Sequence, residues 1–530
     1  MFLSLLLCLS LCLTLLSFLL TFFLSRKNPI SYPLIDSLFV FYKNRYRLIH
    51  ASLVAFYKNR YRLIYWYTEL LSESLIGSLV AFYKNRYRLI HWYTELLAES
   101  SSGTIVVRRL GAQRTIVTAN EKNVEYILKT KFSNFPKGKA FTEFLGDFLG
   151  YGIFNVDGEM WKSQRKLACH EFSTRCLREF VVKVLEDEVE NQLVRVLENA
   201  VENESVVDLQ VVLKRFAFDT ICKVALGFDP SQMDSSETDR LACAFDTASM
   251  FSAMRGGAMV NAVWKLKRWL NVGSEKRLKE AVAVVHDAVD EIILVEKNKM
   301  RLNRGENSEN SEKSLLWRLL SAGIDDGLVR DMVISFLMAG RDTTSSAMTW
   351  LFWLISQNQD VEERLLNEIL LSSEELVFDE LKEMRYMKAC ISESMRLYPP
   401  VVWDSKHAAN DDVLPDGTVV YKGNRVTYFP YGMGRMEELW GKDRLEFRPD
   451  RWLDESGGLK MVSPYKYPVF QAGPRVCLGK EMAFIQMKYA VASVLRRFVI
   501  KPVCLDQPVF VPLLTGHMAG GLKVRVFKRV

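Results

Sequence analysis

One cysteine lies in a segment whose residue types could bind a metal ion through sulfur. Cys477 stands near the end of the segment Phe470–Gly479, FQAGPRVCLG. Apolar residues at helical spacing follow it, so we expect the cysteine just before a helix, where unpaired N–H groups and the positive dipole end favour a thiolate. Gly473 and Gly479 remove side chains where the backbone must turn or approach a flat ligand. The alternative is a buried structural cysteine after a glycine turn.

The segment closely resembles the haem-binding loop of the cytochrome P450 superfamily, whose pattern is Phe, two residues, Gly, one residue, Arg, one residue, Cys, one residue, Gly. The five anchor positions are all present as Phe470, Gly473, Arg475, Cys477 and Gly479. The resemblance implies that Cys477 is the axial ligand of the iron in haem b and that Arg475 pairs with a haem propionate. Phe470 would then shield the sulfur from water, which tunes an iron–thiolate bond.

A second segment places small, acidic and hydroxyl residues in a long helical pattern that starts near Asp326 and passes Trp353. It is Ala339–Thr344, AGRDTT. Small side chains leave room beside a helix for a diatomic ligand, and a threonine can bond the carbonyl four residues back and bend the helix. The segment resembles the oxygen-binding groove of the superfamily's central helix, which implies that Thr343 contacts the oxygen and Asp342 relays protons to it. The alternative is a packing kink with solvated polar residues.

Two weaker patterns fit the same resemblance. Glu393 and Arg396 are three apart on one helical face, a spacing that usually means a surface ion pair. The superfamily buries such a pair against a later arginine, here Arg451, and the role implied is structural. Trp161 and Arg165 are four apart on a predicted helix. The resemblance implies that they bind a haem propionate, for which bidentate arginine is suited.

These motifs follow the order that the superfamily uses, and the resemblance covers roughly residue 75 to the end of the chain. Longer stretches are similar to the plant fatty-acid ω-hydroxylase branch, namely residues 398–419, 426–436 and 468–488. The run Asp404–Ala408 is most similar to enzymes that hydroxylate jasmonoyl-amino acid conjugates, especially jasmonoyl-isoleucine. The activity implied is hydroxylation of the terminal (ω) region of a fatty acid or of such a conjugate.

The substrate implied is a lipophilic carboxylate whose apolar tail, not its acid head, must reach the iron. Four residues are expected to form the pocket wall: Val402, Trp403, Leu514 and Thr515. Lys406 or His407 is a further candidate for a haem contact. No basic residue stands out by its spacing as the partner of the substrate carboxylate.

The chemistry implied uses O2 and electrons from outside the chain. The sequence has no Gly-x-Gly-x-x-Gly after a strand and no spare domain for a flavin, so we expect a separate NADPH-dependent flavoprotein reductase that docks on a basic face near the cysteine. One rival is a haem-thiolate enzyme that rearranges fatty-acid hydroperoxides, although Asp342 and Thr343 argue against it. Another is a non-catalytic membrane-associated binding protein.

The amino terminus predicts a membrane anchor. Residues 1–25 carry no charge, and residues 2–24 are apolar apart from a few Ser and Thr. This is long enough to span a bilayer, and the features of a cleaved signal peptide are missing. Between residues 26 and 100, eleven Lys and Arg minus five Asp and Glu give +6 of the chain's net +7. We therefore expect a single-pass anchor in the endoplasmic reticulum, a cytosolic catalytic domain, contact of the basic patch with lipid or an acidic partner, and no nucleic-acid binding.

An eight-residue segment, YKNRYRLI, occurs three times, starting at Tyr42, Tyr57 and Tyr83. The spacing is uneven and the copies have barely diverged, which excludes a solenoid and favours a recent duplication or a faulty gene model. We expect only the third copy to lie on the globular domain. The domains predicted are an anchor at 1–25, a basic hinge with duplicated segments at 26–76 and a haem-thiolate catalytic domain at 77–530.

Composition agrees with a large globular core. The chain has 530 residues, 49% hydrophobic and 25% charged, and nine scattered cysteines that suggest neither disulfides nor zinc. The fold class predicted is mainly α, the helical triangular prism of the cytochrome P450 superfamily. A small β-rich lobe is expected near residues 104–118 and 401–428, and one transmembrane helix is expected before the domain.

Overall fold

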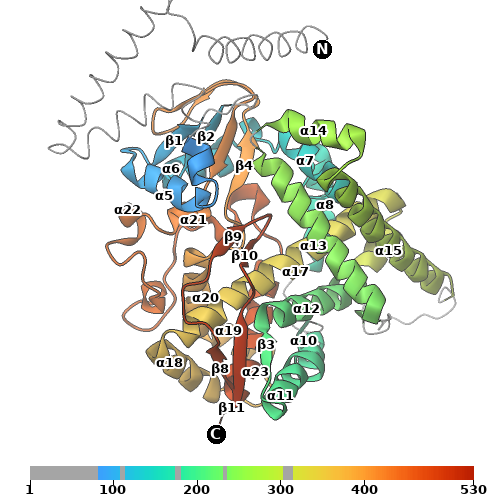
Figure 1. Ribbon diagram of the computed structural model, residues 1–530, viewed down its shortest axis with the longest axis vertical. Coiled ribbons are helices and arrows are strands. Elements are labelled where there is room, and N and C mark those ends of the chain that lie inside the picture. The colour runs from blue at the N-terminus through green and yellow to red at the C-terminus, as the bar shows by residue number, and fades with distance from the viewer. Residues whose placement is uncertain are drawn as a thin grey trace, which may run out of the picture. The chain divides into compact units, whose positions relative to one another are not determined.

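Most of the catalytic domain is described in a computed structural model of the chain (Figure 1). The described residues are 81–107, 114–172, 181–230, 235–258, 260–302 and 314–529. The predicted anchor, the first two copies of the repeat and the predicted hinge lie outside them. Within the described part of the chain, none of the helices is both long enough and apolar enough to cross a membrane.

Helices make up most of the described structure, as the sequence predicts. In chain order they are α5 (Leu89–Glu99), α6 (Glu121–Glu125), α7 (Lys139–Leu149), α8 (Gly158–Glu171), α10 (Val182–Glu188), α11 (Arg195–Glu202), α12 (Leu209–Ile221), α13 (Ser235–Gly257), α14 (Asn261–Leu270), α15 (Ser274–Leu302), α16 (Leu315–Ser321), α17 (Asp326–Ser356), α18 (Gln359–Leu370), α19 (Phe378–Glu383), α20 (Arg385–Leu397), α21 (Pro430–Met433), α22 (Glu437–Trp440) and α23 (Lys480–Arg497).

Within the residues that the structure describes, the strands form four small sheets. They are β1 (Thr104–Val107), β2 (Thr115–Thr118), β3 (Val206–Asp208), β4 (Asp404–His407), β5 (Asp412–Val413), β6 (Val419–Val420), β7 (Arg425–Tyr428), β8 (Phe498–Pro502), β9 (Phe510–Pro512), β10 (Gly516–Met518) and β11 (Lys523–Lys528). The largest sheet has the order β1-β2-β7-β4, in which only the β2–β7 pair is parallel. The predicted β-rich lobe is confirmed, because this sheet joins segments from both of the expected regions.

Helix α17 runs through the middle of the described region, where α12 and α20 pack against it (Figure 1). It begins where the Asp325 carboxylate accepts a hydrogen bond from the Leu328 N–H at 3.3 Å, which caps an otherwise unpaired donor. From Val329 onward most of its side chains are buried on every face, as expected of a helix at the centre of a domain. The helix predicted to run from near Asp326 past Trp353 is confirmed.

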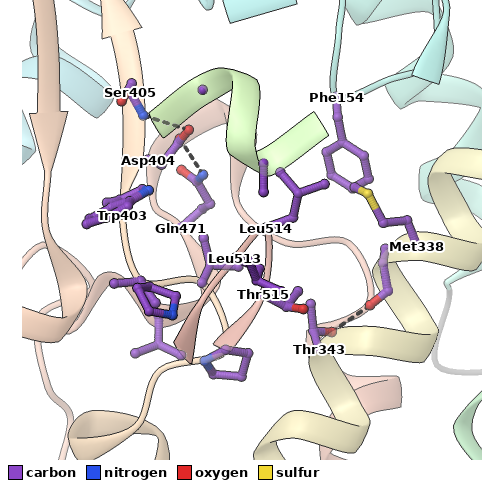
Figure 2. Close-up of a pocket in the computed structure, with 18 of the residues that line it drawn as sticks. Phe154, Met338, Thr343, Trp403, Asp404, Ser405, Gln471, Leu513, Leu514 and Thr515 are labelled. Atoms are coloured by element: carbon purple, nitrogen blue, oxygen red, sulfur yellow. Dashed lines mark hydrogen bonds between the residues drawn. The ribbon is translucent and has the colours of Figure 1, made fainter. Parts of the chain in front are cut away.

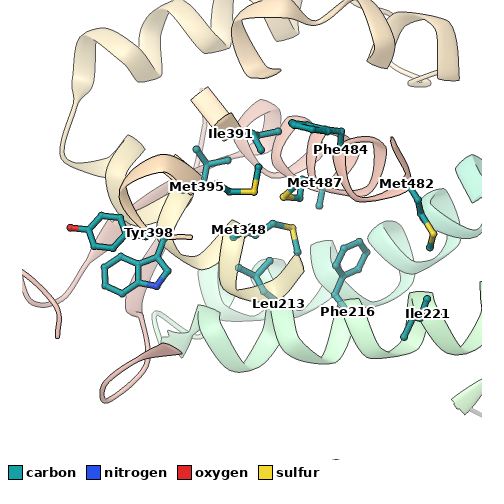
Figure 3. Packing of buried hydrophobic residues seen from close by; sticks show 14 of the residues in the cluster. Leu213, Phe216, Ile221, Met348, Ile391, Met395, Tyr398, Met482, Phe484 and Met487 are labelled. Atoms are coloured by element: carbon teal, nitrogen blue, oxygen red, sulfur yellow. The ribbon is translucent and has the colours of Figure 1, made fainter. Parts of the chain in front are cut away.

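The main core lies between α17 and three helices that cover it. Figure 3 shows methionines from α17, α20 and α23 meeting side chains of α12, and a flexible thioether suits such irregular gaps. At one end of this core, Trp350 of α17 is fully buried and stacks on Tyr398, with ring centroids 4.0 Å apart and planes 8° apart. This stack fixes α17 against the segment that follows α20.

Replacing Trp350 with alanine should lower the free energy of unfolding by about 3–5 kcal/mol, because it empties a fully enclosed site. The matched control is Trp269→Ala on α14, where the indole is 80% exposed and the expected change is below about 0.5 kcal/mol. Urea unfolding followed by intrinsic fluorescence and circular dichroism measures both. Equal losses in the two variants would contradict this account of the core.

Candidate active site

A cavity of about 1040 Å³ lies between the cysteine loop, α17, the β1-β2-β7-β4 sheet and the loop after β9. Its walls are mainly apolar, with a few polar side chains gathered in separate places. The volume and lining suit a large, mostly apolar ligand held by a small number of polar groups. All four residues predicted for the substrate wall line this cavity: Val402, Trp403, Leu514 and Thr515. The last three of them are labelled in Figure 2.

Cys477 is exposed to the cavity that it lines, and the surrounding protein still desolvates its sulfur. Its backbone N–H donates to the Phe470 carbonyl at 2.8 Å, which closes the loop, and the ring of Phe470 lines the cavity beside it. Burial raises the pKa of the Cys477 thiol, while the Gly479 N–H, Arg165 and Lys480 act in the opposite direction. These donors and charges are of the kind that stabilise a buried thiolate.

The turn before the cysteine requires glycine at one position. Gly473 has φ +65°, and a Cβ there would lie 2.0 Å from the Leu128 carbonyl oxygen, so only glycine fits. Gly479 has φ −84°, and its Cβ would meet no atom of the protein nearer than 3.9 Å. The packing of the chain itself therefore does not demand glycine at 479, and its expected approach to a flat ligand stays a prediction.

A strained residue in this loop was not predicted. Gln471 has φ +62°, which is uncommon for a residue with a side chain and costs of order 1 kcal/mol. Its Nε2 donates to Asp404 Oδ2 at 2.7 Å, a bond drawn in Figure 2. This charge-assisted hydrogen bond offsets the strain and ties the cysteine loop to the start of β4.

Three residues predicted to bind the propionates come together on the wall beside Cys477. Trp161 is buried, and the guanidinium of Arg475 lies 4.5 Å from its ring centroid. Arg165 Nη2 donates to the Val476 carbonyl at 2.9 Å. Arg475 also has a partner within the protein, because its Nη2 lies 2.7 Å from Asp157 Oδ1. That carboxylate orients the guanidinium toward the cavity wall and offsets part of its charge.

The central helix presents Thr343 to the cavity but not Asp342. Thr343 Oγ1 donates to the Ala339 carbonyl at 2.5 Å, the bond to the preceding turn that the sequence suggests, and it is visible in Figure 2. Asp342 is buried away from the cavity wall, with Oδ1 3.2 Å from Arg341 Nη1, which also lies 2.8 Å from Asp246. Asp342 is not part of the cavity wall, whereas Ala339, Thr343 and Thr344 of the same helix are. The structure therefore does not bring the expected proton relay at Asp342 to the site.

Glu393, Arg396 and Arg451 form one buried cluster. Arg396 donates to both carboxylate oxygens of Glu393 at 2.8 Å, and neither side chain is exposed. Arg451 Nε donates to Glu393 Oε1 at 3.3 Å, and Trp452 Nε1 to Oε2 at 2.9 Å. None of these residues lines the cavity. Buried charges are costly unless they are paired, so this arrangement suits the structural role predicted for the three charged residues.

A second buried charge cluster was not predicted. Asp404, at the start of β4, accepts from Lys137 Nζ at 2.5 Å and from Lys406 Nζ at 2.8 Å. The two lysines hold the pKa of Asp404 well below its usual value, although burial opposes them. Burial lowers the pKa of Lys406 to about 7, although Asp404 opposes it. Lys406 does not line the cavity, and His407 Nδ1 instead lies 2.5 Å from the Lys137 carbonyl oxygen. No local spacing connects Lys137 with Asp404.

The residues around Cys477 fit the haem that the sequence resemblance implies. A flat, largely apolar ring suits the walls, and a soft sulfur ligand suits iron. Arg165 and Arg475 supply positive charge for two carboxylates, and the turn at Gly473 leaves no room for a Cβ. Cys477 would hold the iron, Trp161, Arg165 and Arg475 would hold the propionates, and Phe470 would cover the sulfur.

Substituting Gly473 with alanine should lower stability by at least about 1–3 kcal/mol, because the added Cβ meets the Leu128 carbonyl in a left-handed backbone. We expect less haem per protein, measured as the ratio of Soret to protein absorbance, and a lower unfolding temperature. The control is Gly146→Ala in α7, where nothing lies within 4 Å of the added Cβ. A Gly473→Ala protein with full haem content and unchanged stability would contradict the assigned turn.

The chain is similar to known proteins over most of its length. The sequence profile of the family described as Cytochrome P450 matches residues 74–516. Cytochrome P450 94B3 of Arabidopsis thaliana is 62% identical, over 94% of this chain and 92% of its own length. Cytochrome P450 94B1 of the same plant is 60% identical, over 95% of this chain and 92% of its own length. Cytochrome P450 94A1 of Vicia sativa is 47% identical, over 79% of this chain and 82% of its own length.

The family match and the site agree. Cytochromes P450 are haem-binding monooxygenases, and this chain brings the cysteine of their haem loop to the wall of a large apolar cavity. The mainly helical fold with a small β lobe is the one predicted from the sequence. The chain therefore belongs to the cytochrome P450 family and is a haem-dependent oxidoreductase.

Proposed function

We propose that this protein hydroxylates the terminal region of a fatty acid or of a jasmonoyl-amino acid conjugate such as jasmonoyl-isoleucine. The observation that carries the proposal is the cavity of about 1040 Å³, whose apolar walls extend from Cys477 and Thr343 to a polar sheet face. The three stretches similar to the ω-hydroxylase branch support the same substrate class. The overall reaction takes the substrate, O2, NADPH and a proton to the hydroxylated substrate, water and NADP⁺.

Bound haem supplies the reductive activation of O2 and the transfer of one oxygen atom to a C–H bond. The chain's own residues position the reactants and control water. Thr343 carries a hydroxyl on the cavity wall, and its bond to Ala339 fixes where that hydroxyl points. Aromatic and aliphatic side chains around the cavity favour an apolar tail over water. A tail held there places its end, and not its acid head, at the reacting position.

Electrons would come from a separate NADPH-dependent flavoprotein reductase. Lys166 on α8 and Lys480 at the start of α23 are exposed, and they belong to the same elements as Arg165 and the Cys477 loop. Exposed cations near the haem site would attract an acidic partner surface and speed its association. This supports docking on the cysteine side of the domain.

We also propose that residues 1–25 anchor the protein in the endoplasmic reticulum with the catalytic domain in the cytosol. The uncharged apolar run and the basic residues that follow it support this orientation. Helix α14 adds support, because it exposes a set of large apolar side chains next to exposed Lys267: Val263, Leu266, Trp269 and Leu270. A helix with such a face suits the boundary between lipid and water.

Turnover of a substrate panel tests the proposal. Full-length protein reconstituted with reductase in lipid vesicles should add one oxygen atom near the chain end of fatty acids or jasmonoyl-isoleucine, seen by mass spectrometry, and only with NADPH. Cys477→Ser should abolish turnover and the red-shifted Soret band of the reduced carbon monoxide complex. Consumption of a fatty-acid hydroperoxide without reductase would favour the rearranging enzyme instead. Folded protein that takes up no haem would favour a non-catalytic binding protein.

The orientation predicts that Asn203 carries no glycan. Asn203, Glu204 and Ser205 form an N-glycosylation sequon and all three are exposed, so access does not limit modification. In plant or yeast microsomes the protein should keep its mobility after treatment with an endoglycosidase. A sequon engineered before Met1 is the control, because it should be glycosylated in the lumen. A glycan on Asn203 would reverse the proposed topology.

A further inference from the structure

One face of the β1-β2-β7-β4 sheet forms a polar stretch of the otherwise apolar cavity wall. Arg425 and Thr427 of β7 both line the cavity, as alternate residues of a strand should. Ser405 of β4 lies opposite Thr427 in the antiparallel pair, and Thr115 of β2 lies opposite Arg425 in the parallel pair. The sheet register thus places one guanidinium and three hydroxyls on a single face.

Hydrogen bonds join three of these side chains, here named the Arg425 ladder: Arg425, Ser405 and Thr427. Arg425 Nε donates to Ser405 Oγ at 2.9 Å, and Ser405 Oγ shares a hydrogen bond with Thr427 Oγ1 at 2.8 Å. Ser405 and Thr427 are only 1% and 5% exposed. Nη1 of Arg425 also approaches the Gly256 carbonyl of α13 at 3.5 Å. The guanidinium is therefore held in one orientation at the cavity wall.

The other cationic side chains that line the cavity have contacts or expected partners away from the ladder. Arg165 and Arg475 lie beside Cys477, where they fit the propionates of haem. Lys137 is paired with Asp404 at 2.5 Å. Arg86 is exposed, and its guanidinium lies 4.0 Å from the ring of Tyr83. Arg425 is a cavity arginine on the sheet side, apart from these sites.

The acidic residue next to Ser405 in the chain has its charge offset by two lysines. Asp404 adjoins Ser405, but its carboxylate is bound by both Lys137 and Lys406. The cluster carries +1 when both lysines are charged and zero when Lys406, with its pKa of about 7, is neutral, so in neither state does it repel an anion.

Ser405 of the ladder lies across the pocket from Thr343. Figure 2 shows Ser405 and Trp403 on one side, Met338 and Thr343 on the other, and Leu513 and Leu514 between them. A substrate that presents its chain end to the side of Thr343 has its acid head at the opposite end of the cavity. An arginine fork held by hydrogen bonds is well suited to a carboxylate.

We propose that the Arg425 ladder binds the carboxylate of the substrate and so selects acids over neutral lipids. The inference rests on the proposed function, because it assumes a lipophilic acid whose tail is oxidised. It adds the residue that sets the orientation of that acid.

The test compares binding of dodecanoic acid and of jasmonoyl-isoleucine with binding of their methyl esters, followed by the shift of the Soret band in the full-length holoprotein. The native protein should bind each acid more tightly than its ester. Arg425→Gln should weaken acid binding about 10- to 100-fold, because a charge-assisted contact is lost, and leave ester binding within about twofold. The matched control is Arg240→Gln on α13, an exposed arginine outside the cavity, which should change neither.

Ser405→Ala keeps the cation and removes its support, so a smaller loss of acid binding, about 3- to 10-fold, is expected even if Arg425→Gln fails to fold. Equal weakening of acid and ester, or unchanged acid binding in the folded Arg425→Gln protein, would overturn the inference. If the native protein hydroxylates acids and esters equally well, the proposed function stands and the ladder does not select acids. If it binds and oxidises neither, the proposed function fails and the inference fails with it.

Discussion

The closed loop from Phe470 to Cys477 is the constraint on which the rest of the site depends. Desolvation raises the pKa of the Cys477 thiol, so its surroundings must supply donors that favour the thiolate. The Cys477 N–H bonded to the Phe470 carbonyl, the Gly473 backbone against the Leu128 carbonyl, and Arg475 paired with Asp157 fix the loop from three directions. Because Leu128 and Asp157 come from distant parts of the chain, the position of the sulfur depends on the tertiary fold as well as on the loop.

Two buried carboxylates hold the surroundings of this loop, in different ways. Glu393 lies away from the cavity and is bound by Arg396, Arg451 and Trp452, so it joins α20 to the segment before the cysteine loop. Asp404 lies on the cavity wall and is bound by two lysines and by Gln471. A buried acid is tolerated when its partners surround it, and loss of one partner leaves an unpaired charge. Both clusters therefore make the elements around the cavity rigid.

Local spacing predicted what depends on neighbouring residues, and failed where distant residues decide. The span of α17 and the Thr343 bond to Ala339 follow from nearby residues, and the β-rich lobe was predicted from the resemblance to a family. The direction in which Asp342 points does not follow from nearby residues. A helix buried on all faces has no apolar stripe, so the sequence cannot show that Asp342 lies against Arg341. The pairs Arg475–Asp157 and Lys137–Asp404 join residues 318 and 267 positions apart, and neither is marked by a local motif. The resemblance to a family predicted the residues of the haem site, and the structure revealed the ion pairs that hold them in place.

Two parts of the cavity wall are built by different elements, and a side-chain hydrogen bond joins them. The cysteine loop and α17 contribute Cys477 and Thr343, and β4 and β7 contribute Ser405 and Arg425. Gln471 follows Phe470 directly, and its side chain reaches Asp404, which directly precedes Ser405. The backbone strain at Gln471 is the cost of this connection. The bond therefore ties the cysteine loop to the strand that carries Ser405, so the fold holds these two parts of the wall together.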